Sequence, residues 1–302
     1  MPSTTSIEDF IVWHGLRVSR RTGKPPAPRT LDSKASCLRA CLRAAQATDL
    51  SVLATIIADR EQAECLFDTL ASRMTSGSAA NAFNALTAFG EYAKAMGWIQ
   101  SVAFSAKDRP PDNPKKPIRV YSPDEMEALL GNARGRGLRW WAFLHTLADT
   151  GRRIGEVLAL EWSWLNLSAD VPHFNLPTTK NGKQQYVPLN AYLRESVFTA
   201  ANIAELRAET RHGSNRQFGR SPQSFVFPWT HTTVAGMFNR YCEAVGVESR
   251  GFHCFRHTKA TELLGKGVPL QAVSMLLGHS NVSTTYNRYH HATTLAYANY
   301  LD

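Results

Sequence analysis

The chain has 302 residues, of which 43% are hydrophobic, and this supplies enough apolar surface for one large core or two modest ones. A net charge of +9 at pH 7 and a pI near 9.5 favour a polyanionic partner, which can be DNA, RNA or an acidic membrane surface. No apolar run reaches membrane-spanning length, and the opening residues, MPSTTSIEDF, lack the charged and then apolar build of a secretion signal, so we expect a cytosolic protein without a membrane partner.

The five cysteines form an odd, scattered set without Cys-x-x-Cys spacing. We therefore expect reduced, mostly buried thiols, and neither disulfides nor a zinc site. The set consists of Cys37, Cys41, Cys65, Cys242 and Cys254.

Residues 1–110 are predicted to form a small bundle of short helices. Apolar positions recur at helical spacing in 7–18, from residue 33 onward, in 51–75 with an interruption, and in 78–96. We find no helix-turn-helix or zinc-finger pattern in this region.

Basic side chains of this region are candidate nucleic-acid contacts. Arg39 and Arg43 fall one turn apart, on the side of their helix opposite to the apolar residues. Taken singly, each is most simply a solvated surface charge. As a group in a basic chain they are predicted to contact phosphates, because each such contact releases condensed counterions. The group consists of Arg17, Arg20, Arg21, Arg39, Arg43 and Lys94.

Residues 111–119 are predicted to link two domains, since they are rich in proline and charge and poor in apolar side chains. Ser122, Pro123 and Glu125 then have the spacing of a capping box with proline at the first helical position. A second domain is therefore predicted to span residues 120–302.

An apolar helix, 138–148, leads into the sequence Thr-Gly-Arg-Arg-Ile-Gly-Glu at 150–156. A glycine turn that feeds a helix N-terminus presents backbone N–H groups and the positive end of the helix dipole to an anion. An arginine at that place adds a two-pronged donor, so this segment is a candidate phosphate site.

Two strands, 171–177 and 183–189, are predicted on either side of Asn181-Gly182, the strongest short hairpin signal in a sequence. Lys180 and Lys183 flank that turn. Further helices are predicted at 191–210 and 232–245.

The last part of the chain carries side chains that suit phosphate chemistry. His253 and Arg256 are three apart at the head of a predicted helix, so both leave the same face and can bind an anion. A second helix is predicted to open at Pro269 and to end at Gly278, which directs His279 away from the helix end.

A third short helix is predicted after N-cap candidates at 283–285. On this helix Tyr286 and Tyr289 are three apart and are expected to share a face. Two imidazoles, a guanidinium and a phenol are thus delivered by successive short helices, which indicates a functional site rather than a core.

These motifs together resemble those of the tyrosine recombinases, the phage integrase family. The resemblance rests on the Thr-Gly-x-Arg-x-x-Glu turn with its following apolar run and Trp162, on the string LLGHS at 276–280, and on the pair Arg288-Tyr289. It implies a mainly α fold with a small antiparallel β-sheet. An N-terminal helical-bundle domain would bind the core DNA site, and a C-terminal tyrosine recombinase catalytic domain would act as a site-specific recombinase or integrase.

The resemblance implies that Tyr289 attacks a DNA phosphate, forms a 3′-phosphotyrosine and releases a 5′-hydroxyl. The family's tyrosine usually follows the Gly-His histidine by nine residues, and in this chain that position is Arg288. Tyr289 is one residue further on and has the family's Arg-Tyr context, so it is preferred to Tyr286.

A free phenol has a pKa near 10 and needs a general base at neutral pH, for which His253 is the candidate.

The same pattern assigns the clamp on the phosphate oxygens to Arg153 and Arg256. Arg152 is disfavoured, because a shift of one residue rotates it about a third of a turn away. Glu156 is expected to orient Arg153 or His253 from behind.

His279 is expected to hydrogen-bond a non-bridging oxygen, and Lys180 to protonate the leaving 5′-oxygen, with Lys183 as the alternative lysine. All the required groups are then protein side chains, so no metal, ATP or other cofactor is expected. The implied partners are double-stranded recombination sites and further copies of the chain, as a tetramer in the synapse. The implied location is the cytoplasm, on the nucleoid.

Two other functions use the same residues. A type IB topoisomerase-like nicking and closing enzyme shares the chemistry but needs no pair of sites. A DNA-binding regulator that has lost catalysis belongs to a different class, and the complete set of catalytic residue types argues against it.

Overall fold

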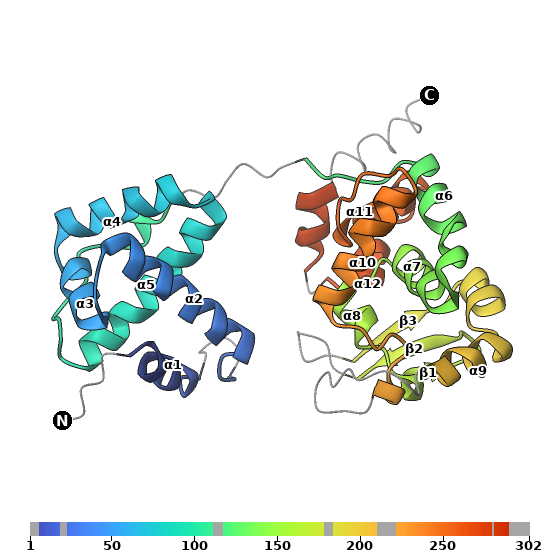
Figure 1. Cartoon of the computed structure of the whole chain (residues 1–302), viewed down its shortest axis with the longest axis horizontal. Helices are drawn as coiled ribbons and strands as arrows, with labels where there is room; N and C mark the ends of the chain where they lie inside the picture. The colour runs from blue at the N-terminus through green and yellow to red at the C-terminus, as the bar shows by residue number, and fades with distance from the viewer. Residues whose placement is uncertain are drawn as a thin grey trace. The chain divides into compact units, whose positions relative to one another are not determined.

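The computed structural model describes residues 6–18, 23–110, 117–177, 184–209, 222–279 and 281–289. The chain divides into two compact units, Met1–Lys116 and Pro117–Asp302, and each unit has its own hydrophobic core. Figure 1 labels the helices and strands of both units.

The N-terminal unit is helical in its described part. Its helices are α1 (Ile7–Gly15), α2 (Pro28–Ala45), α3 (Leu50–Ala58), α4 (Arg60–Arg73) and α5 (Ser76–Ala95), followed by the short turn η1 (Ala106–Asp108). Asp59 interrupts the predicted third helix, since it ends α3 in an extended conformation and its carboxylate accepts a hydrogen bond from the Gln62 N–H, 2.9 Å, to cap α4. Helix α2 begins at Pro28 rather than near residue 33, because proline suits the first helical position.

Aromatic side chains of α1 and α5 form the centre of this core. Phe10 packs edge-on against Phe89 and Tyr92, with ring centroids 6.2 and 5.6 Å apart, and all three side chains are buried. Gly90, beside Phe89 on α5, permits a close approach of the chain that follows the helix. A Cβ added there would lie 2.5 Å from Val102 Cγ1.

Gly90→Ala should destabilise the N-terminal unit by about 1–3 kcal/mol, because the added methyl group overfills this contact. Urea unfolding of the full chain, followed by circular dichroism, measures the effect. Gly77→Ala is the matched control on the same helix, with no atom within 4 Å of its added Cβ, and it should be neutral or stabilise by up to about 1 kcal/mol. Equal stabilities of the two variants would contradict this account of the packing.

The C-terminal unit is built around α7 (Leu138–Thr150), most of whose residues are buried. The other helices in the described part of this unit are α6 (Pro123–Gly131), α8 (Ile154–Leu158), α9 (Ala200–Glu209), α10 (His231–Ala244), α11 (His253–Gly265), α12 (Leu270–Leu277) and the helical residues 282–289. Short turns are η2 (Ala133–Arg136), η3 (Trp162–Trp164), η4 (Leu193–Val197) and η6 (Pro222–Ser224). The predicted capping box opens α6: the Glu125 N–H donates to Ser122 Oγ (3.2 Å) and the Ser122 N–H donates to Glu125 Oε2 (2.8 Å).

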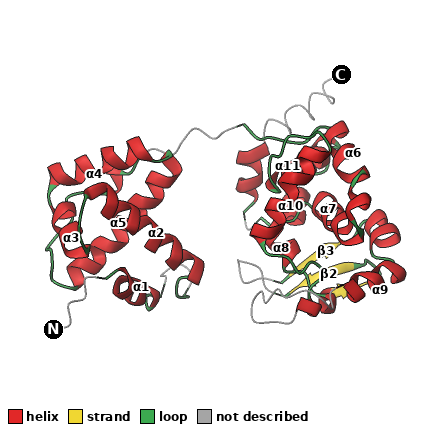
Figure 2. Cartoon of the chain, viewed as in Figure 1, coloured by secondary structure: helices red, strands yellow, loops and turns green. Residues whose placement is uncertain are grey.

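A small antiparallel sheet lies beside these helices (Figure 2). Its strands, in the order β1-β2-β3 among the described residues, are β1 (Leu165–Asn166), β2 (His173–Leu176) and β3 (Gln185–Pro188). His173 pairs with Pro188 and Leu176 with Gln185. The two strands are antiparallel neighbours as predicted, but a two-residue turn at Asn181-Gly182 would have placed Leu176 opposite Val187, so the predicted register is wrong by two residues. The predicted fold class, mainly α with a small antiparallel sheet, is confirmed.

The predicted helix 191–210 is interrupted rather than continuous. Residues 191–197 are helical, with a π-helical turn, η4, at Leu193–Val197, and after a break at residues 198–199 α9 starts at Ala200. The side chain of Asn202 supplies the physical reason, because its Nδ2 donates to the carbonyls of Ser196 and Val197 at 2.8 and 3.0 Å and so satisfies acceptors that a continuous helix would have used.

Two predictions from composition can be compared with the described residues. Cys41, Cys242 and Cys254 are buried, Cys37 is partly buried, Cys65 is exposed, and all are free thiols. Within the described part of the chain no single helix is long and apolar enough for a membrane span, whereas α2 and α3 reach that threshold together across their bend.

Candidate active site

Arg256, on the first turn of α11, is the buried centre of the candidate site. Its side chain is 3% exposed, and its Nη1 donates to the carbonyl oxygens of Gly151 (3.1 Å) and Leu277 (2.7 Å). Burial, followed by the charge of Arg153, lowers its pKa to about 10, so the guanidinium stays charged at neutral pH. Its Nη2 has no hydrogen-bond partner among the described residues. One donor of a buried cation is therefore left for an anion.

Arg153 is the N-cap residue of α8, and its position is fixed by hydrogen bonds to Glu156, three residues later. Its Nη1 donates to Glu156 Oε1 at 2.9 Å, and its backbone N–H donates to Glu156 Oε2 at 3.2 Å. The Arg153 side chain is 42% exposed and that of Glu156 only 19%. Glu156 therefore contacts Arg153, one of the two side chains that it was expected to orient.

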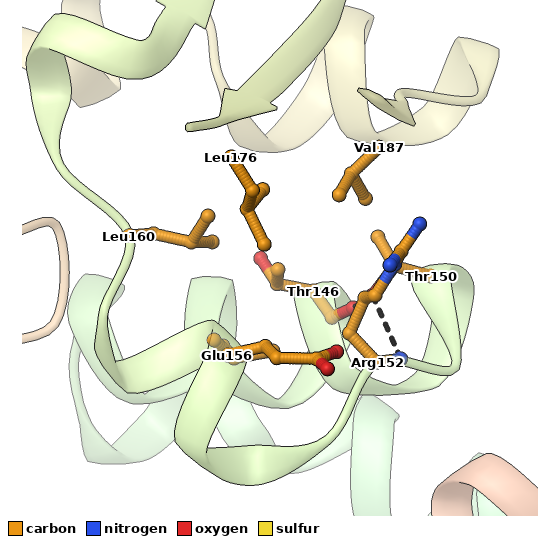
Figure 3. Close-up of a pocket in the computed structure, with 8 residues that line it drawn as sticks. Thr146, Thr150, Arg152, Glu156, Leu160, Leu176 and Val187 are labelled. Carbon is orange, nitrogen blue, oxygen red and sulfur yellow. Dashed lines mark hydrogen bonds between the residues drawn. The ribbon is translucent and has the colours of Figure 1, made fainter. Parts of the chain in front are cut away.

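Arg152 lies in a different environment from its neighbour. Its side chain is 3% exposed, and its guanidinium donates to Gln185 Oε1 and to the Tyr186 carbonyl, both on β3. Figure 3 shows it beside a small cavity that Thr146, Thr150 and Glu156 also line, with its backbone N–H bonded to Thr150 Oγ1. These contacts give Arg152 a structural connection to the hairpin, in contrast to the half-exposed Arg153.

Two predicted histidines border the arginines. His253 is the exposed first residue of α11, and partial burial together with the charges of Arg256 and Arg153 lowers its pKa. His279 follows the C-terminal glycine of α12, and its Nδ1 is 2.6 Å from Thr285 Oγ1. Burial and the same two arginines lower the pKa of His279 to about 4, so both imidazoles are neutral at pH 7.

Tyr289 and Tyr286 differ sharply in exposure. The Tyr289 side chain is 2% exposed and packs with Ala260, Leu264 and neighbouring apolar residues of α11 and α12, whereas Tyr286 is 56% exposed. The expectation that the two tyrosines share a face is therefore wrong. A separation of three residues rotates the side chain by about 300° around the helix axis, which leaves Tyr286 in solvent and turns Tyr289 into the core. Burial raises the pKa of Tyr289, while Arg256 and Arg288 act in the opposite direction.

The hydroxyl of Tyr289 meets a residue that the sequence analysis missed. His257 Nδ1 lies 2.6 Å from this oxygen, and the two ring centroids are 5.7 Å apart. A signal was present in the sequence, because His257 follows Arg256 directly and lies one helical turn after His253, on the same side of α11.

The predicted catalytic residues that the structure describes lie together. The charge of Arg153 affects the pKa values of His253, Arg256 and His279, and Arg256 and Tyr289 affect each other. Lys180 and Lys183 lie outside the described residues. In the described part of the chain, no three His, Cys, Asp or Glu side chains are grouped so that they could hold a metal ion.

Two glycines allow the segments of the site to approach one another. Gly278 has a φ of 70°, and a Cβ added to it would lie 2.6 Å from Gln185 Oε1 and 2.8 Å from Arg152 Nη1. Gly151 has a φ of 60°, and its added Cβ would lie 3.0 Å from Leu277 Cδ2. The Thr-Gly-Arg turn, the end of α12 and β3 therefore meet at positions where the backbone favours glycine and an added Cβ would make neighbouring side chains shift.

The basic residues of the N-terminal unit were predicted to contact phosphates. In the structure Arg39 pairs with Glu8 at 3.5 Å, Lys94 pairs with Glu91 at 2.6 Å, and Arg17 lies over the Trp13 ring at 4.5 Å. Arg43 is exposed on α2, and Arg20 and Arg21 lie outside the described residues. Surface ion pairs are weak enough to be exchanged for phosphate contacts. Phosphate binding by these basic residues therefore stays a prediction.

Comparisons with known proteins agree with this arrangement. The model of the Phage integrase family matches residues 119–295, so the chain belongs to the phage integrase family, and the resemblance to the tyrosine recombinases is confirmed. Similar sequences include tyrosine recombinase XerC of Bacillus pumilus, 29% identical over 211 residues (67% of this chain, 66% of that one), and tyrosine recombinase XerD of Caulobacter vibrioides, 28% identical over 242 residues (76% and 75%). The chain spans 66%, 52% and 60% of the length of three such relatives.

Solved structures show the same fold. The Tn1549 transposon integrase in complex with transposon right end DNA has a TM-score of 0.67 at 18% identity, over 98% of this chain and 99% of that one. A lambda integrase dimer bound to a COC′ core site also has a TM-score of 0.67, at 16% identity, over 93% of this chain and 76% of that one.

Gly278→Ala should disrupt the site as well as the fold, because its added Cβ collides with the Gln185 and Arg152 side chains in addition to straining the backbone. Gly246→Ala is the matched control, since Gly246 has the same φ of 70° and nothing lies within 4 Å of its added Cβ. The free energy of unfolding of this control should fall by only about 1–2 kcal/mol, the cost of placing alanine in a left-handed conformation. Thermal unfolding measures the difference, and a Gly278→Ala variant as stable as the control would contradict the close approach.

Proposed function

We propose that the protein is a site-specific DNA recombinase or integrase that cleaves and rejoins strands through a 3′-phosphotyrosine intermediate. One observation carries this proposal: a buried arginine, Arg256, has a donor nitrogen without a partner among the described residues, and its charge acts on the pKa of the Tyr289 phenol. The sequence relatives are named tyrosine recombinases, which supports the same reaction for this chain.

The scissile phosphate would bind between Arg256 and Arg153. Preorganised donors aimed at the non-bridging oxygens stabilise the charge that grows on them in the transition state. The neutral imidazoles of His253 and His279 would add hydrogen bonds from either side, without the desolvation cost of two further cations. Glu156 would keep the Arg153 guanidinium in place through its 2.9 Å hydrogen bond.

The chemical step would be an in-line attack by the Tyr289 oxygen on phosphorus. The P–O5′ bond breaks, the 3′-phosphate becomes linked to the tyrosine, and the 5′-oxygen leaves with a proton supplied by Lys180. Attack by a 5′-hydroxyl of another strand reverses the step. The protein–DNA bond conserves the energy of the broken linkage, so the proposed cycle consumes no ATP.

The proposed substrate is double-stranded DNA carrying a pair of recombination sites, on the nucleoid. The N-terminal unit would bind the core site through its basic side chains. Lambda integrase has been seen as a dimer on a core site and as a tetramer on a Holliday junction, and we propose a tetramer for this chain in its synapse.

Tyr289→Phe should abolish covalent trapping of DNA, because the variant has no oxygen to attack phosphorus. The assay incubates the full chain with a randomised pool of nicked duplexes, separates protein-linked DNA under denaturing conditions, and maps the broken bond. Tyr286→Phe, three residues away and exposed, should trap DNA as the wild type does. Loss of the adduct in the Tyr286 variant alone would assign the nucleophile to Tyr286 instead.

The duplex selected by trapping also separates recombination from simple nicking and closing. Two differently labelled copies of that duplex should yield products that carry both labels. Relaxation of a supercoiled plasmid without joined products would instead indicate a topoisomerase-like enzyme.

Arg39→Gln combined with Arg43→Gln should weaken binding of the selected duplex. The slope of log K against log salt should fall in magnitude by about 2, because each lost phosphate contact removes about 0.9 from it. Arg73→Gln, an exposed arginine on α4 of the same unit, is the control and should leave the slope unchanged. A slope unchanged by the double substitution would remove these two arginines from the DNA interface.

A further inference from the structure

The phenol of the proposed nucleophile is already engaged in a specific contact. Tyr289 is 2% exposed, and its hydroxyl lies 2.6 Å from Nδ1 of His257, well within hydrogen-bond range. The ring of Tyr289 is fixed by apolar residues of α11 and α12, so the direction of its hydroxyl toward His257 is set by the core. His257 lies at the start of the second turn of α11, directly after Arg256 in the sequence.

The other two histidines of the site have different surroundings. His279 has its Nδ1 on Thr285 Oγ1 at 2.6 Å. His253 is the exposed first residue of α11, and the charges of Arg256 and Arg153 act on its pKa. The His257 imidazole has its Nδ1 at hydrogen-bond distance from the phenolic oxygen, 2.6 Å.

The protonation states of the pair suit a transfer from oxygen to nitrogen. Burial, then electrostatic interaction with Arg288, His253 and Arg256, lowers the pKa of His257 to about 4, so the imidazole is neutral at pH 7. Burial raises the pKa of Tyr289, so the phenol keeps its proton before substrate binds. A neutral imidazole bonded to a protonated phenol accepts through Nδ1 and carries its own hydrogen on Nε2.

We propose that His257 is a catalytic residue that takes the phenolic proton of Tyr289 during strand cleavage, an inference that rests on the proposed function. As the Tyr289 oxygen bonds to phosphorus, its O–H bond breaks and the proton passes to His257 Nδ1. The P–O5′ bond breaks at the same time, and the 5′-oxygen receives a different proton, the one expected from Lys180. When a 5′-hydroxyl attacks the phosphotyrosine, the His257 imidazolium returns its proton to the phenolate.

Substrate binding would itself strengthen this base. The groups that face His257 are Arg256 and His253 on α11, Arg288 and Tyr289 on the helical residues 282–289, and His279 after α12. A phosphate bound at the arginines adds negative charge among these groups and so makes protonation of His257 more favourable. Without DNA the same base is weak and the nucleophile stays protonated.

Two substitutions separate proton transfer from simple positioning. Asparagine at this place, His257→Asn, puts an amide near the Nδ1 position and keeps a hydrogen-bonding group, but it cannot take a proton. His257→Ala removes both functions. Both variants should form the covalent adduct on the selected nicked duplex about 10²–10⁴-fold more slowly than the wild type.

The pH profile identifies the role of the imidazole. The rate of adduct formation by the wild type should fall toward acid pH as His257 becomes protonated in the complex, whereas the rate of the Asn variant should lack this decrease.

A duplex with a 5′-bridging sulfur at the scissile bond tests the proton of the leaving group, because a thiolate leaves without protonation. It should rescue Lys180→Ala and should not rescue His257→Asn.

His145→Asn is the matched control, because His145 also lies inside a helix, α7, and its Nε2 is 3.5 Å from a tyrosine hydroxyl, that of Tyr192. Its rate and its pH profile should match the wild type. Duplex affinity and circular dichroism of each variant establish that the fold is kept.

Wild-type rates in His257→Asn, or an unchanged acid limb, would overturn the proposal and leave His257 a positioning residue. Rescue of His257→Asn by the bridging sulfur would also overturn it, since the missing proton step would then be that of the leaving group. Failure of the proposed function has a different signature, in which the wild-type protein itself forms no adduct on any duplex of the pool.

Discussion

The guanidinium of Arg256 is the interaction on which the rest of the site depends. Burying a cation costs free energy unless its N–H groups are hydrogen-bonded. Here Nη1 of Arg256 donates hydrogen bonds to the backbone carbonyl oxygens of Gly151 and Leu277. Each carbonyl belongs to a different motif, so satisfying the arginine draws the Thr-Gly-Arg turn and the end of α12 to α11. The nitrogen left over, Nη2, has no partner in the described part of the chain. An anion at that place would offset an existing penalty, which is how a fold can be organised for its substrate before the substrate arrives.

The second constraint is the close backbone packing around this arginine. Gly151 and Gly278 adopt left-handed conformations, and a Cβ added at either would be tightly packed, under 3.0 Å from its nearest neighbours at Gly278 and 3.0 Å at Gly151. Arg152 uses the space beside Gly278 to bond Gln185 and the Tyr186 carbonyl on β3. Adjacent arginines thus divide two tasks, since Arg152 ties the hairpin to the helical layer while Arg153 remains half exposed near the other cations.

Features set by short-range chemistry were predictable from the sequence. The capping box of Ser122 and Glu125, the antiparallel arrangement of the two strands, and the common helix of His253 and Arg256 all follow from residue types and spacing along a few positions, whereas the register of the strands does not. The family motifs extended this to the fold class and to the set of residues that now lie together.

Features set by tertiary packing were not predictable in the same way. Helical spacing places Tyr286 and Tyr289 close together, but only the core decides which one is buried. The contact of Tyr289 with His257 joins two helices separated by α12, and nothing local to either residue requires it. The break before α9 depends on Asn202, whose amide was as compatible with a continuous helix as with the turn that it stabilises.

The helical residues 282–289 are attached to the site at two points. Thr285 is bonded to His279, and Tyr289, one turn later, is bonded to His257. Movement of this helical turn as a unit would break both hydrogen bonds, so the Thr285 hydroxyl and the Tyr289 hydroxyl together hold the nucleophile against α11 and the end of α12.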